Sequence, residues 1–353
     1  MDKIRVGIIG AGGYGGCGAI EILSRHPYAE LKALIDKQDV GRPISELYPH
    51  LEGFCDLPIL SPDDAERLEN LDVVFFSTPD GVGQKEAPYW LARGIKVIDY
   101  SGDFRFNDPE IYKGYAERIG RKAAHASPHL LKEAVYGLAE LHRGEIAQAR
   151  IVGNPGCFAV SCILGLAPAL KEGLIGQEGI VCDAKTGVSG AGKNPSPTFH
   201  YPARYEAMNA YKVSGHQHVY EIERELSLAA GRQINITFTP HVVPLCRGIM
   251  STLYGKLDQG LSARTIEEAY RAFYKEDDFI RIYGPQKPLV STNVRGSNFC
   301  ALSVNMDERT GMLIIVSHID NLVKGQAGSA VQNMNIMFGL PENAGLNHPG
   351  LYP

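Results

Sequence analysis

The sequence predicts an α/β protein with two domains: a Rossmann-type, doubly wound parallel sheet, and an α+β domain built on a mixed sheet. Three observations support this prediction. Short β-branched runs alternate with helical patterns over roughly the first 150 residues, as in a parallel sheet covered by helices. A glycine-rich turn follows the first of these runs, at residues 10–15. Beyond residue 157 the strand-like runs become longer.

In the first domain, strands are expected where short apolar runs are closed by turn-forming or acidic residues. The expected strands are residues 3–10, 29–36, 71–79 and 94–102, with helices at 16–26 and 84–94. A further strand-like run precedes residue 153. Strands and helices that alternate in this way predict parallel pairing.

In the second domain, long β-rich runs are interrupted by two helical patterns. The runs are residues 178–192, 234–257 and 311–321, and the helical patterns are residues 218–231 and 262–276. Residues 190–204 are polar and rich in Pro and Gly, so a surface loop is expected there. A last helical pattern at 328–339 is expected to return to the first domain.

Composition and charge exclude several classes of function. The 353 residues are 44% hydrophobic and 21% charged, which is ordinary for a globular enzyme, and the net charge of -5 does not favour nucleic acid or an anionic membrane as partner. We expect neither a signal peptide nor a membrane span, since no apolar run reaches the roughly 18 residues that a spanning helix needs. Seven scattered cysteines without a C-x-x-C pair indicate reduced thiols and a cytoplasmic compartment.

The turn Gly10-Ala11-Gly12-Gly13-Tyr14-Gly15 fits the G-x-G-x-x-G pattern, directly after a strand and at the start of a helix. Such glycines let the backbone approach a pyrophosphate, and the helix N-terminus donates N–H groups to it. Asp36, 21 residues after Gly15, is placed to bind a ribose 2′-hydroxyl of NAD. Lys37 and Arg42 could instead meet the 2′-phosphate of NADP, so both cofactors stay open.

The stretch G-N-P-G-C-F, residues 153–158, lies between a strand-like run and a helical pattern. Cys157 is therefore expected in or next to the first turn of a helix, where the helix dipole favours a thiolate and backbone N–H groups can bind an oxyanion. We interpret Cys157 as a nucleophile, although a buried structural cysteine is the usual alternative. Cys162, inside the helix, fits that alternative.

A nucleophilic thiol needs a base, and S-G-H-Q-H offers His216 and His218. Two residues apart, they would face the same side of a strand. His218 is the first choice as acid and base and His216 the second, while either one could be structural. No third ligand has suitable spacing, so no metal site is expected.

Cationic side chains are candidates for binding an anionic substrate. Arg105 follows the expected strand 94–102, near the carboxyl edge where such sheets bind ligands, and could clamp a carboxylate or phosphate. An ordinary surface arginine is the alternative. Lys185, Lys193, Arg204 and Arg247 are weaker candidates.

Together these motifs resemble the N-acetyl-gamma-glutamyl-phosphate reductase family, within the aspartate-semialdehyde dehydrogenase group, along nearly the whole chain. In order, the resemblance rests on GAGGYGG, VFFSTPDGV, VIDYSGDFRF, VYGLAELHR, GNPGCF, GVSGAG, YKVSGHQHVYEIE, FTPHVVPLCRGI, RGSNF and DNLVKGQAGSAVQNMN. The chain departs from the family's usual residues at Gly12, Gly15, Asp80, Gln217, Val219 and Tyr220.

The resemblance implies NADPH-dependent reduction of N-acetyl-gamma-glutamyl phosphate to the 5-semialdehyde, with release of phosphate, through a thioester on Cys157. It implies a dinucleotide-binding domain at 1–155 and 322–353, a catalytic and oligomerisation domain at 156–321, and a homo-oligomer, dimer or tetramer. Residues expected near the cofactor by this resemblance are Gly10, Gly12, Gly13, Tyr14, Gly15, Asp36, Lys37, Ser77, Thr78, Pro79, Ser189, Gly190, Asn321 and Gln326. Asn154 joins Arg105, Lys185 and Arg247 near the substrate.

Two alternatives stay open. Some relatives apply the same chemistry to aminoadipyl phosphate attached to a small acidic carrier protein in lysine biosynthesis. A protein of this fold could also sense nucleotides without catalysis, although Cys157 and both histidines argue against that.

Overall fold

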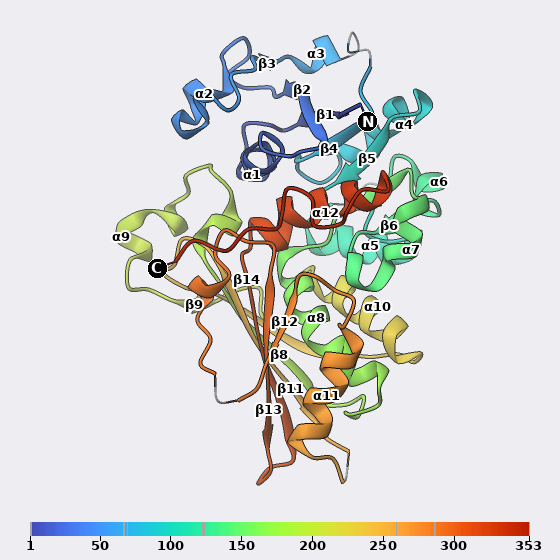
Figure 1. The fold of residues 1–353 in the computed structure, drawn as a ribbon, viewed down its shortest axis with the longest axis vertical. Coiled ribbons are helices and arrows are strands. Elements are labelled where there is room, and N and C mark those ends of the chain that lie inside the picture. The colour runs from blue at the N-terminus through green and yellow to red at the C-terminus, as the bar shows by residue number, and fades with distance from the viewer. Residues whose placement is uncertain are drawn as a thin grey trace. The chain divides into compact units, whose positions relative to one another are not determined.

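The computed structural model describes residues 2–352, apart from residues 66, 67, 69, 122, 123, 259 and 286. It divides the chain into two compact units (Figure 1). The first unit runs to Pro155 and also includes Gln326–His348, whereas the second consists of Gly156–Gly325 and the residues from Pro349 onward.

The first unit is built on a parallel sheet with strand order β3-β2-β1-β4-β5-β7-β6. β4 is buried at every position, as expected of a strand covered on both faces. β3 and β6 are two-residue edge strands, too short to show a period in the sequence. The strands are β1 Ile4–Ile9, β2 Ala29–Ile35, β3 Ile59–Leu60, β4 Val73–Phe76, β5 Lys96–Asp99, β6 Val135–Tyr136 and β7 Ile151–Gly153.

Helices alternate with these strands, and the C-terminal helix returns to this unit as predicted. α12 packs against α1 and α7. Asn335 Oδ1 lies 3.0 Å from His26 Nε2, and Asn333 Nδ2 donates to the Gly137 carbonyl at 2.8 Å. The helices are α1 Tyr14–Leu23, α2 Ile44–Leu47, η1 Pro49–Leu51, α3 Pro62–Ala65, α4 Gly83–Ala92, α5 Pro109–Arg118, α6 Pro128–Leu131, α7 Ala139–Gln148 and α12 Gly328–Met337.

The second unit contains the predicted mixed sheet, with strand order β12-β13-β14-β11-β8-β10-β9. The pairs β8–β10 and β12–β13 are parallel, and the other described pairs are antiparallel. The β-rich run 234–257 forms two strands on either side of β8, because the chain turns at 243–248, where Gly248 has a φ of 115°. The strands are β8 Ile180–Thr186, β9 Asn209–Ala210, β10 Ile236–Val242, β11 Ile249–Lys256, β12 Ile280–Tyr283, β13 Cys300–Asp307 and β14 Met312–Ile319.

The long helix α8 is the central helix of this unit, and nearly all of it is buried. It packs on β11 and β14, with α10 and α11 as neighbours (Figure 1). A side chain at Gly165 would come within 2.2 Å of Leu253, so this glycine allows the helix to approach the sheet closely. The helices that begin in this unit are α8 Cys157–Lys171, η2 Val188–Ala191, η3 Pro197–Phe199, α9 Tyr201–Arg204, α10 Val219–Ala230, α11 Ala263–Phe273, η4 Ser291–Asn293 and η5 Val323–Ala327.

The predicted surface loop 190–204 is mostly exposed or half-buried and contains η3 and α9. Within the described part of the chain, no helix combines the length and apolar character needed to cross a membrane.

Candidate active site

Cys157 is the first residue of α8, as predicted, and its side chain is partly exposed. Gly156 is the N-cap in extended conformation, and no side chain among the described residues caps this end of the helix. The first-turn N–H groups of an α-helix lack partners within the helix. The thiol therefore lies beside backbone donors and the positive end of the helix dipole, a setting that favours a thiolate.

His218 lies directly beside this helix start. It is the N-cap of α10 and buried, and a side chain at Gly156 would come within 2.5 Å of its Nε2. Only a glycine at position 156 allows the imidazole to approach the backbone next to Cys157 so closely.

Glu221, one turn into α10, is fully buried and was not predicted as a site residue. Its Oε2 accepts a hydrogen bond from the Gly156 N–H at 3.0 Å, and its Oε1 lies 3.9 Å from His218 Nε2. The carboxylate therefore contacts both the backbone before Cys157 and the histidine. The signal in the sequence was the i, i+3 spacing of His218 and Glu221 on a helix.

His216 is buried, and its ring lies 4.7 Å from the His218 ring, centroid to centroid. The strand that would have aligned the two rings is absent from the described structure here: residues 216–218 form a turn that leads into α10. Nδ1 of His216 accepts the His218 backbone N–H at 3.1 Å, so the proton of the neutral ring is on Nε2, which faces the Tyr211 hydroxyl at 3.4 Å.

The charge state of His216 follows from its surroundings. Burial, with smaller contributions from the nearby positive charges of His218 and Lys212, lowers the pKa of His216 to about 2. His216 is therefore a neutral imidazole at physiological pH, and it is not available as an imidazolium acid.

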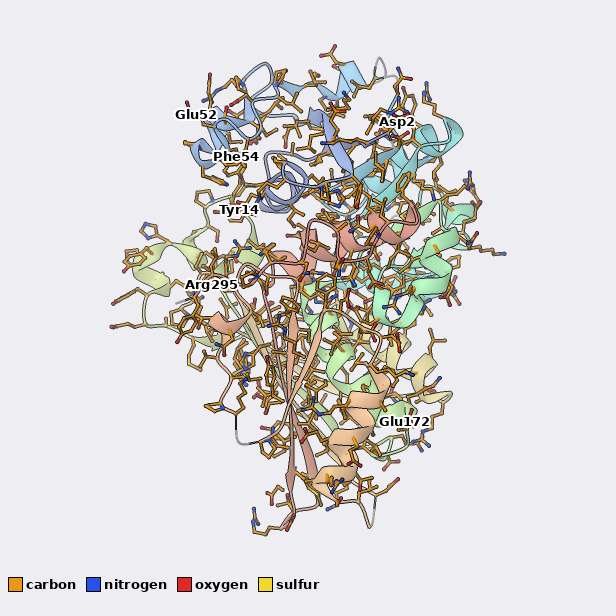
Figure 2. The ribbon with its side chains drawn as sticks, in the orientation of Figure 1. Asp2, Tyr14, Glu52, Phe54, Glu172 and Arg295 are labelled. Carbon is orange, nitrogen blue, oxygen red and sulfur yellow. The ribbon has the colours of Figure 1, made fainter. Side chains whose placement is uncertain are left out.

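In the first unit, the glycine-rich turn joins β1 to α1. Gly10 has a φ of +84°, and a side chain there would come within 2.3 Å of the Ser77 carbonyl. Gly13 is the N-cap of α1, and no described side chain caps it. The side chain of Tyr14 stays at the surface, 37% exposed (Figure 2). The first-turn N–H groups of α1 thus lack a capping side chain among the described residues, which suits a pyrophosphate, whereas the N–H groups of Gly10 to Gly13 already have acceptors in the first unit.

Two glycines of this turn have close neighbours. A side chain at Gly15 would meet Ser77 Oγ at 2.6 Å and Gln326 Nε2 at 2.9 Å, so the structure brings these three predicted residues together. Gly16, which was not predicted, allows helix and strand to pack, because a side chain there would come within 2.5 Å of the Gly10 carbonyl. The sequence signal for Gly16 was the recurrence of glycine at every third residue, at positions 10, 13 and 16.

Asp36 follows β2 and is bound to backbone amides. Its Oδ2 accepts from the Gly12 N–H at 2.9 Å, and its Oδ1 accepts from the N–H groups of Lys37 and Gln38 at 2.7 and 3.2 Å. Lys37 is exposed. Arg42, also exposed, pairs with Asp39 and Glu46.

Ser77, Thr78 and Pro79 follow β4 at the carboxyl edge of the sheet, next to the glycine turn. The Ser77 N–H donates to the Ile9 carbonyl at 2.8 Å. Thr78 Oγ1 is buried and has no hydrogen-bond partner among the described residues. An unpartnered buried hydroxyl beside uncapped backbone N–H groups fits a polar dinucleotide at this edge.

The other expected cofactor residues belong to the second unit. Asn321 Nδ2 donates to Ser189 Oγ at 3.0 Å, and Asn321 Oδ1 accepts from the Gly248 N–H at 2.7 Å. Gly190 lies beside Asn321.

Arg247 is connected to the helix start that bears Cys157. The Arg247 Nη2 donates to Asp320 Oδ1 at 3.2 Å. The backbone carbonyl of Asp320 accepts the Gly325 N–H at 2.9 Å. Gly325 in turn adjoins Cys157, because a side chain at Gly325 would come within 2.7 Å of Cys157 Cβ. Lys185, by contrast, forms an ion pair with Asp183 on β8, with Nζ 2.6 Å from Oδ2.

Arg105 and Asn154 lie in the first unit, and both are buried, so Arg105 is not the surface arginine that was the alternative. Arg105 donates to the carbonyls of Asn154 and Tyr100 at 2.8 and 2.6 Å. Asn154 Nδ2 donates to the Gln326 carbonyl at 3.0 Å, and its Oδ1 accepts from Asn333 at 3.2 Å. In this structure both side chains hold the end of β7 in place.

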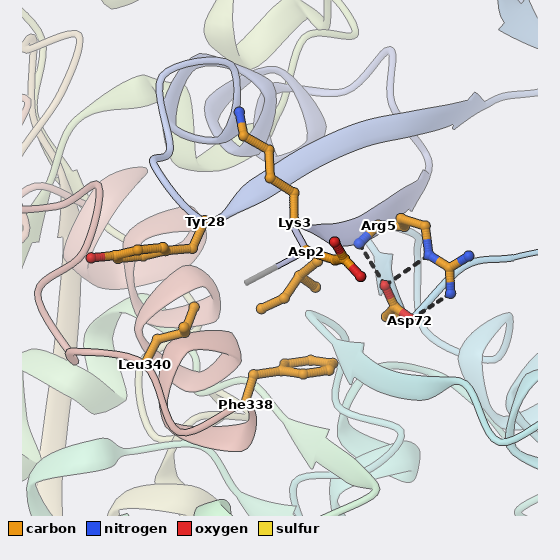
Figure 3. Close-up of a pocket in the computed structure, with 8 residues that line it drawn as sticks. Asp2, Lys3, Arg5, Tyr28, Asp72, Phe338 and Leu340 are labelled. Atoms are coloured by element: carbon orange, nitrogen blue, oxygen red, sulfur yellow. Dashed lines mark hydrogen bonds and ion pairs between the residues drawn. The ribbon is translucent and has the colours of Figure 1, made fainter.

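A cavity of about 590 Å³ lies elsewhere in the first unit, beside the start of β1 (Figure 3). It is lined by Lys3, Tyr28, Phe338 and Leu340 and by the Arg5–Asp72 ion pair, among others. The start of a strand is opposite to the carboxyl edge where parallel sheets bind ligands, so this cavity is separate from the glycine turn.

Comparison with known proteins assigns this chain to a family. A protein of Citrifermentans bemidjiense named N-acetyl-gamma-glutamyl-phosphate reductase is 44% identical over 352 residues, which is 99% of this chain and 100% of that protein. One of the same name from Bacillus anthracis is 43% identical over 350 residues, 99% of this chain and 100% of its own length. The chain belongs to the N-acetyl-gamma-glutamyl-phosphate reductase family.

The family models for semialdehyde dehydrogenases match both units. Residues 5–149 match the NAD binding domain, and residues 157–321 match the dimerisation domain. The first unit therefore contains the nicotinamide-nucleotide-binding domain of an oxidoreductase family. The match to the second domain starts at Cys157.

Solved structures confirm the fold. Aspartate semialdehyde dehydrogenase II from Vibrio cholerae superposes with a TM-score of 0.72 at 17% identity, covering 96% of this chain and 99% of that one. The Candida albicans aspartate semialdehyde dehydrogenase, determined with NADP, superposes with a TM-score of 0.66 at 14% identity, covering 97% of this chain and 100% of that one. This member of the N-acetyl-gamma-glutamyl-phosphate reductase family thus has the same fold as distantly related semialdehyde dehydrogenases.

Proposed function

We propose that this chain reduces N-acetyl-gamma-glutamyl phosphate to N-acetylglutamate 5-semialdehyde with NADPH and releases inorganic phosphate. Relatives at 43–44% identity over nearly the full chain bear the name of that activity. The observation that supports it most directly is the placement of Cys157 at the start of α8 with the His218 ring against Gly156.

In the proposed mechanism, His218 takes the proton of the Cys157 thiol, and the thiolate attacks the acyl phosphate carbonyl. Backbone N–H groups at the start of α8 stabilise the oxyanion while phosphate leaves, which gives a thioester on Cys157. A nicotinamide cofactor held by the first unit would supply the hydride that reduces the thioester carbon. His218 then protonates the resulting oxyanion, and it takes this proton back as the aldehyde forms and the thiolate leaves.

Glu221 is the proposed positioning residue for His218. Its buried carboxylate is close enough to stabilise the imidazolium that forms during the reaction, and its second oxygen fixes the Gly156 N–H. We assign acid/base catalysis to His218 rather than His216, because His216 is neutral and its Nδ1 accepts a backbone N–H.

We assign NADP(H) as the cofactor, with NAD(H) as the alternative. Asp36 already accepts three backbone N–H groups, which leaves its carboxylate poorly placed to recognise a ribose 2′-hydroxyl. The exposed side chains of Lys37 and Arg42 are cations suited to a 2′-phosphate. The ion pairs of Arg42 are exposed, so exchanging them for a phosphate costs little.

The remaining assignments follow from the proposed reaction. The first unit binds the dinucleotide, and the second unit provides catalysis and assembles a cytoplasmic homo-oligomer through the domain whose family model is the dimerisation domain. Arg247, linked to Cys157 through Asp320 and Gly325, is the favoured substrate cation.

The deciding experiment is the reverse reaction. N-acetylglutamate semialdehyde, inorganic phosphate and NADP⁺ should give phosphate-dependent formation of NADPH, more slowly with NAD⁺. If folded protein that binds NADPH shows no turnover, the proposed substrate is wrong. Aminoadipate semialdehyde attached to its carrier protein is then the substrate to assay.

A further inference from the structure

Three side chains of metal-binding type meet beside α1 in the first unit. Cys17 and Glu21 are four residues apart on this helix, so they share one face. His50 of η1 lies against them. Cys17 Sγ, a carboxylate oxygen of Glu21 and a ring nitrogen of His50 all lie within 4.8 Å of one another, and no other such trio was found in the part of the chain that the structure describes.

We propose that Cys17, Glu21 and His50 bind a divalent transition-metal ion, Zn²⁺ by preference, with water as the fourth ligand. One thiolate, one imidazole and one carboxylate form a donor set that selects zinc and related ions, whereas Mg²⁺ and Ca²⁺ prefer oxygen ligands alone. This site is independent of the proposed reaction, because none of its ligands belongs to the Cys157–His218 centre.

The distances require only small movements. His50 Nε2 lies 2.8 Å from Glu21 Oε1, and Cys17 Sγ lies 3.9 Å from the same oxygen. In tetrahedral zinc sites, bonds of about 2.0–2.3 Å separate neighbouring ligand atoms by about 3.3–3.7 Å. The Glu21–His50 pair must open slightly and Cys17 must approach, both within the reach of side-chain rotation.

The surroundings of the three residues suit a site that fills from solvent. Cys17 is buried, at 6% exposure, whereas the His50 side chain is 53% exposed and that of Glu21 is 35% exposed. The open side provides an entry path and room for a water ligand. The buried Leu51 and the Tyr48 hydroxyl, which donates to the Gly12 carbonyl at 2.8 Å, anchor the backbone on both sides of His50.

The structural alternative is a surface His50–Glu21 pair alone. Such an exposed pair contributes little to the stability of the fold, and it does not depend on a neighbouring thiol. The two interpretations therefore differ in whether Cys17 participates.

Co²⁺ binding tests the proposal, because cobalt replaces zinc and reports a thiolate ligand by charge-transfer absorption. The experiment uses the full chain with Cys157→Ala, which removes the other thiol that adjoins histidines. One equivalent of Co²⁺ should produce the thiolate band, and Zn²⁺ should abolish it. Zn²⁺ should also slow amide hydrogen exchange at residues 48–51, since the ion fastens η1 to α1.

Variants identify the ligands. Cys17→Ala should abolish the band. His50→Gln, at an exposed position that leaves the fold intact, should weaken Co²⁺ binding by roughly tenfold or more. The matched controls Cys55→Ala and His129→Gln should leave binding unchanged. Absence of a thiolate band in the Cys157→Ala protein, or a band that persists in Cys17→Ala, would overturn the proposal.

Discussion

Glu221 Oε2 accepts the backbone N–H of Gly156 at 3.0 Å, so a buried carboxylate on α10 holds the residue that immediately precedes Cys157. The other oxygen of Glu221 lies 3.9 Å from His218 Nε2. One side chain thus positions both the start of α8 and the proposed base. The charge of Glu221 beside His218 can therefore be removed by a substitution that keeps the hydrogen bond to Gly156.

Glu221→Gln keeps an oxygen that can accept the Gly156 N–H and removes the negative charge beside His218. We expect kcat to fall roughly 10- to 100-fold and the acid limb of the pH–rate profile to move to lower pH, since an imidazolium without a nearby carboxylate has a lower pKa. The control is Glu225→Gln, one turn further along α10, where the carboxylate pairs with Arg224. An unchanged pH profile in Glu221→Gln would contradict the assigned role.

Cys157→Ser should retain NADPH binding and lose turnover by roughly 10³-fold or more, because serine lacks a thiolate and cannot form the thioester. Mass spectrometry of the wild type with substrate but no reductant should detect an acyl adduct on Cys157. Cys246→Ser, at an exposed thiol, is the matched control and should behave as wild type. Substantial turnover by Cys157→Ser would exclude covalent catalysis.

Arg42→Ala tests the choice of cofactor. If Arg42 binds the 2′-phosphate, KM for NADPH should rise roughly tenfold with little change for NADH, since a charge-assisted contact with phosphate is lost. Arg25→Ala, which removes another exposed arginine after α1, should alter neither constant. Equal effects on both cofactors would argue against a 2′-phosphate site at Arg42.

Gly10→Ala and Gly144→Ala form a matched pair in the first unit. At Gly10 the new methyl group would meet the Ser77 carbonyl at 2.3 Å, and the backbone φ is +84°. We therefore expect the free energy of unfolding to fall by about 1–3 kcal/mol and the affinity for NADPH to decrease. Gly144 lies within α7 with nothing within 4 Å of a built side chain, so alanine there should stabilise by about 0.5–1 kcal/mol. Thermal unfolding with and without NADPH measures both, and equal effects would refute the close approach at Gly10.

Acid should destabilise the second unit through His216. Burial lowers the pKa of His216 to about 2, whereas an unfolded histidine has a pKa near 6.5, so the unfolded state binds more protons between these values. The contribution of His216 to the free energy of unfolding is fully present above about pH 6.5. It decreases as the pH falls, and at pH 5 about 2 kcal/mol has been lost.

Urea unfolding at pH 7.5 and pH 5 measures this loss. His216→Phe should reduce the difference between the two pH values, and His129→Gln, at an exposed histidine, should not. An equal pH dependence in wild type and His216→Phe would show that another group is responsible. His318, whose pKa burial lowers to about 4, is the next candidate.

Sequence alone predicted the features that depend on local order along the chain. The strand–turn–helix at Gly10–Gly15, the mixed second sheet, the helix that begins at Cys157 and the return of the C-terminal helix are all present in the structure. Each follows from hydrophobic periodicity or from glycine and proline signals within a short window.

Tertiary structure decided which distant residues meet. Glu221 reaches Gly156 across 65 positions, and His50 reaches Glu21 across 29, and no periodicity within a window can encode such contacts. Packing also separated two residues that look equivalent in the sequence: His216 accepts a backbone N–H through Nδ1 and its pKa is lowered by burial, whereas His218 lies against Gly156 and Glu221. Sequence by itself therefore determined the family, the fold and the position of Cys157, the proposed nucleophile, at the start of its helix. Packing decided the partners of these residues and the proton on His216, because both depend on desolvation and on contacts between remote segments.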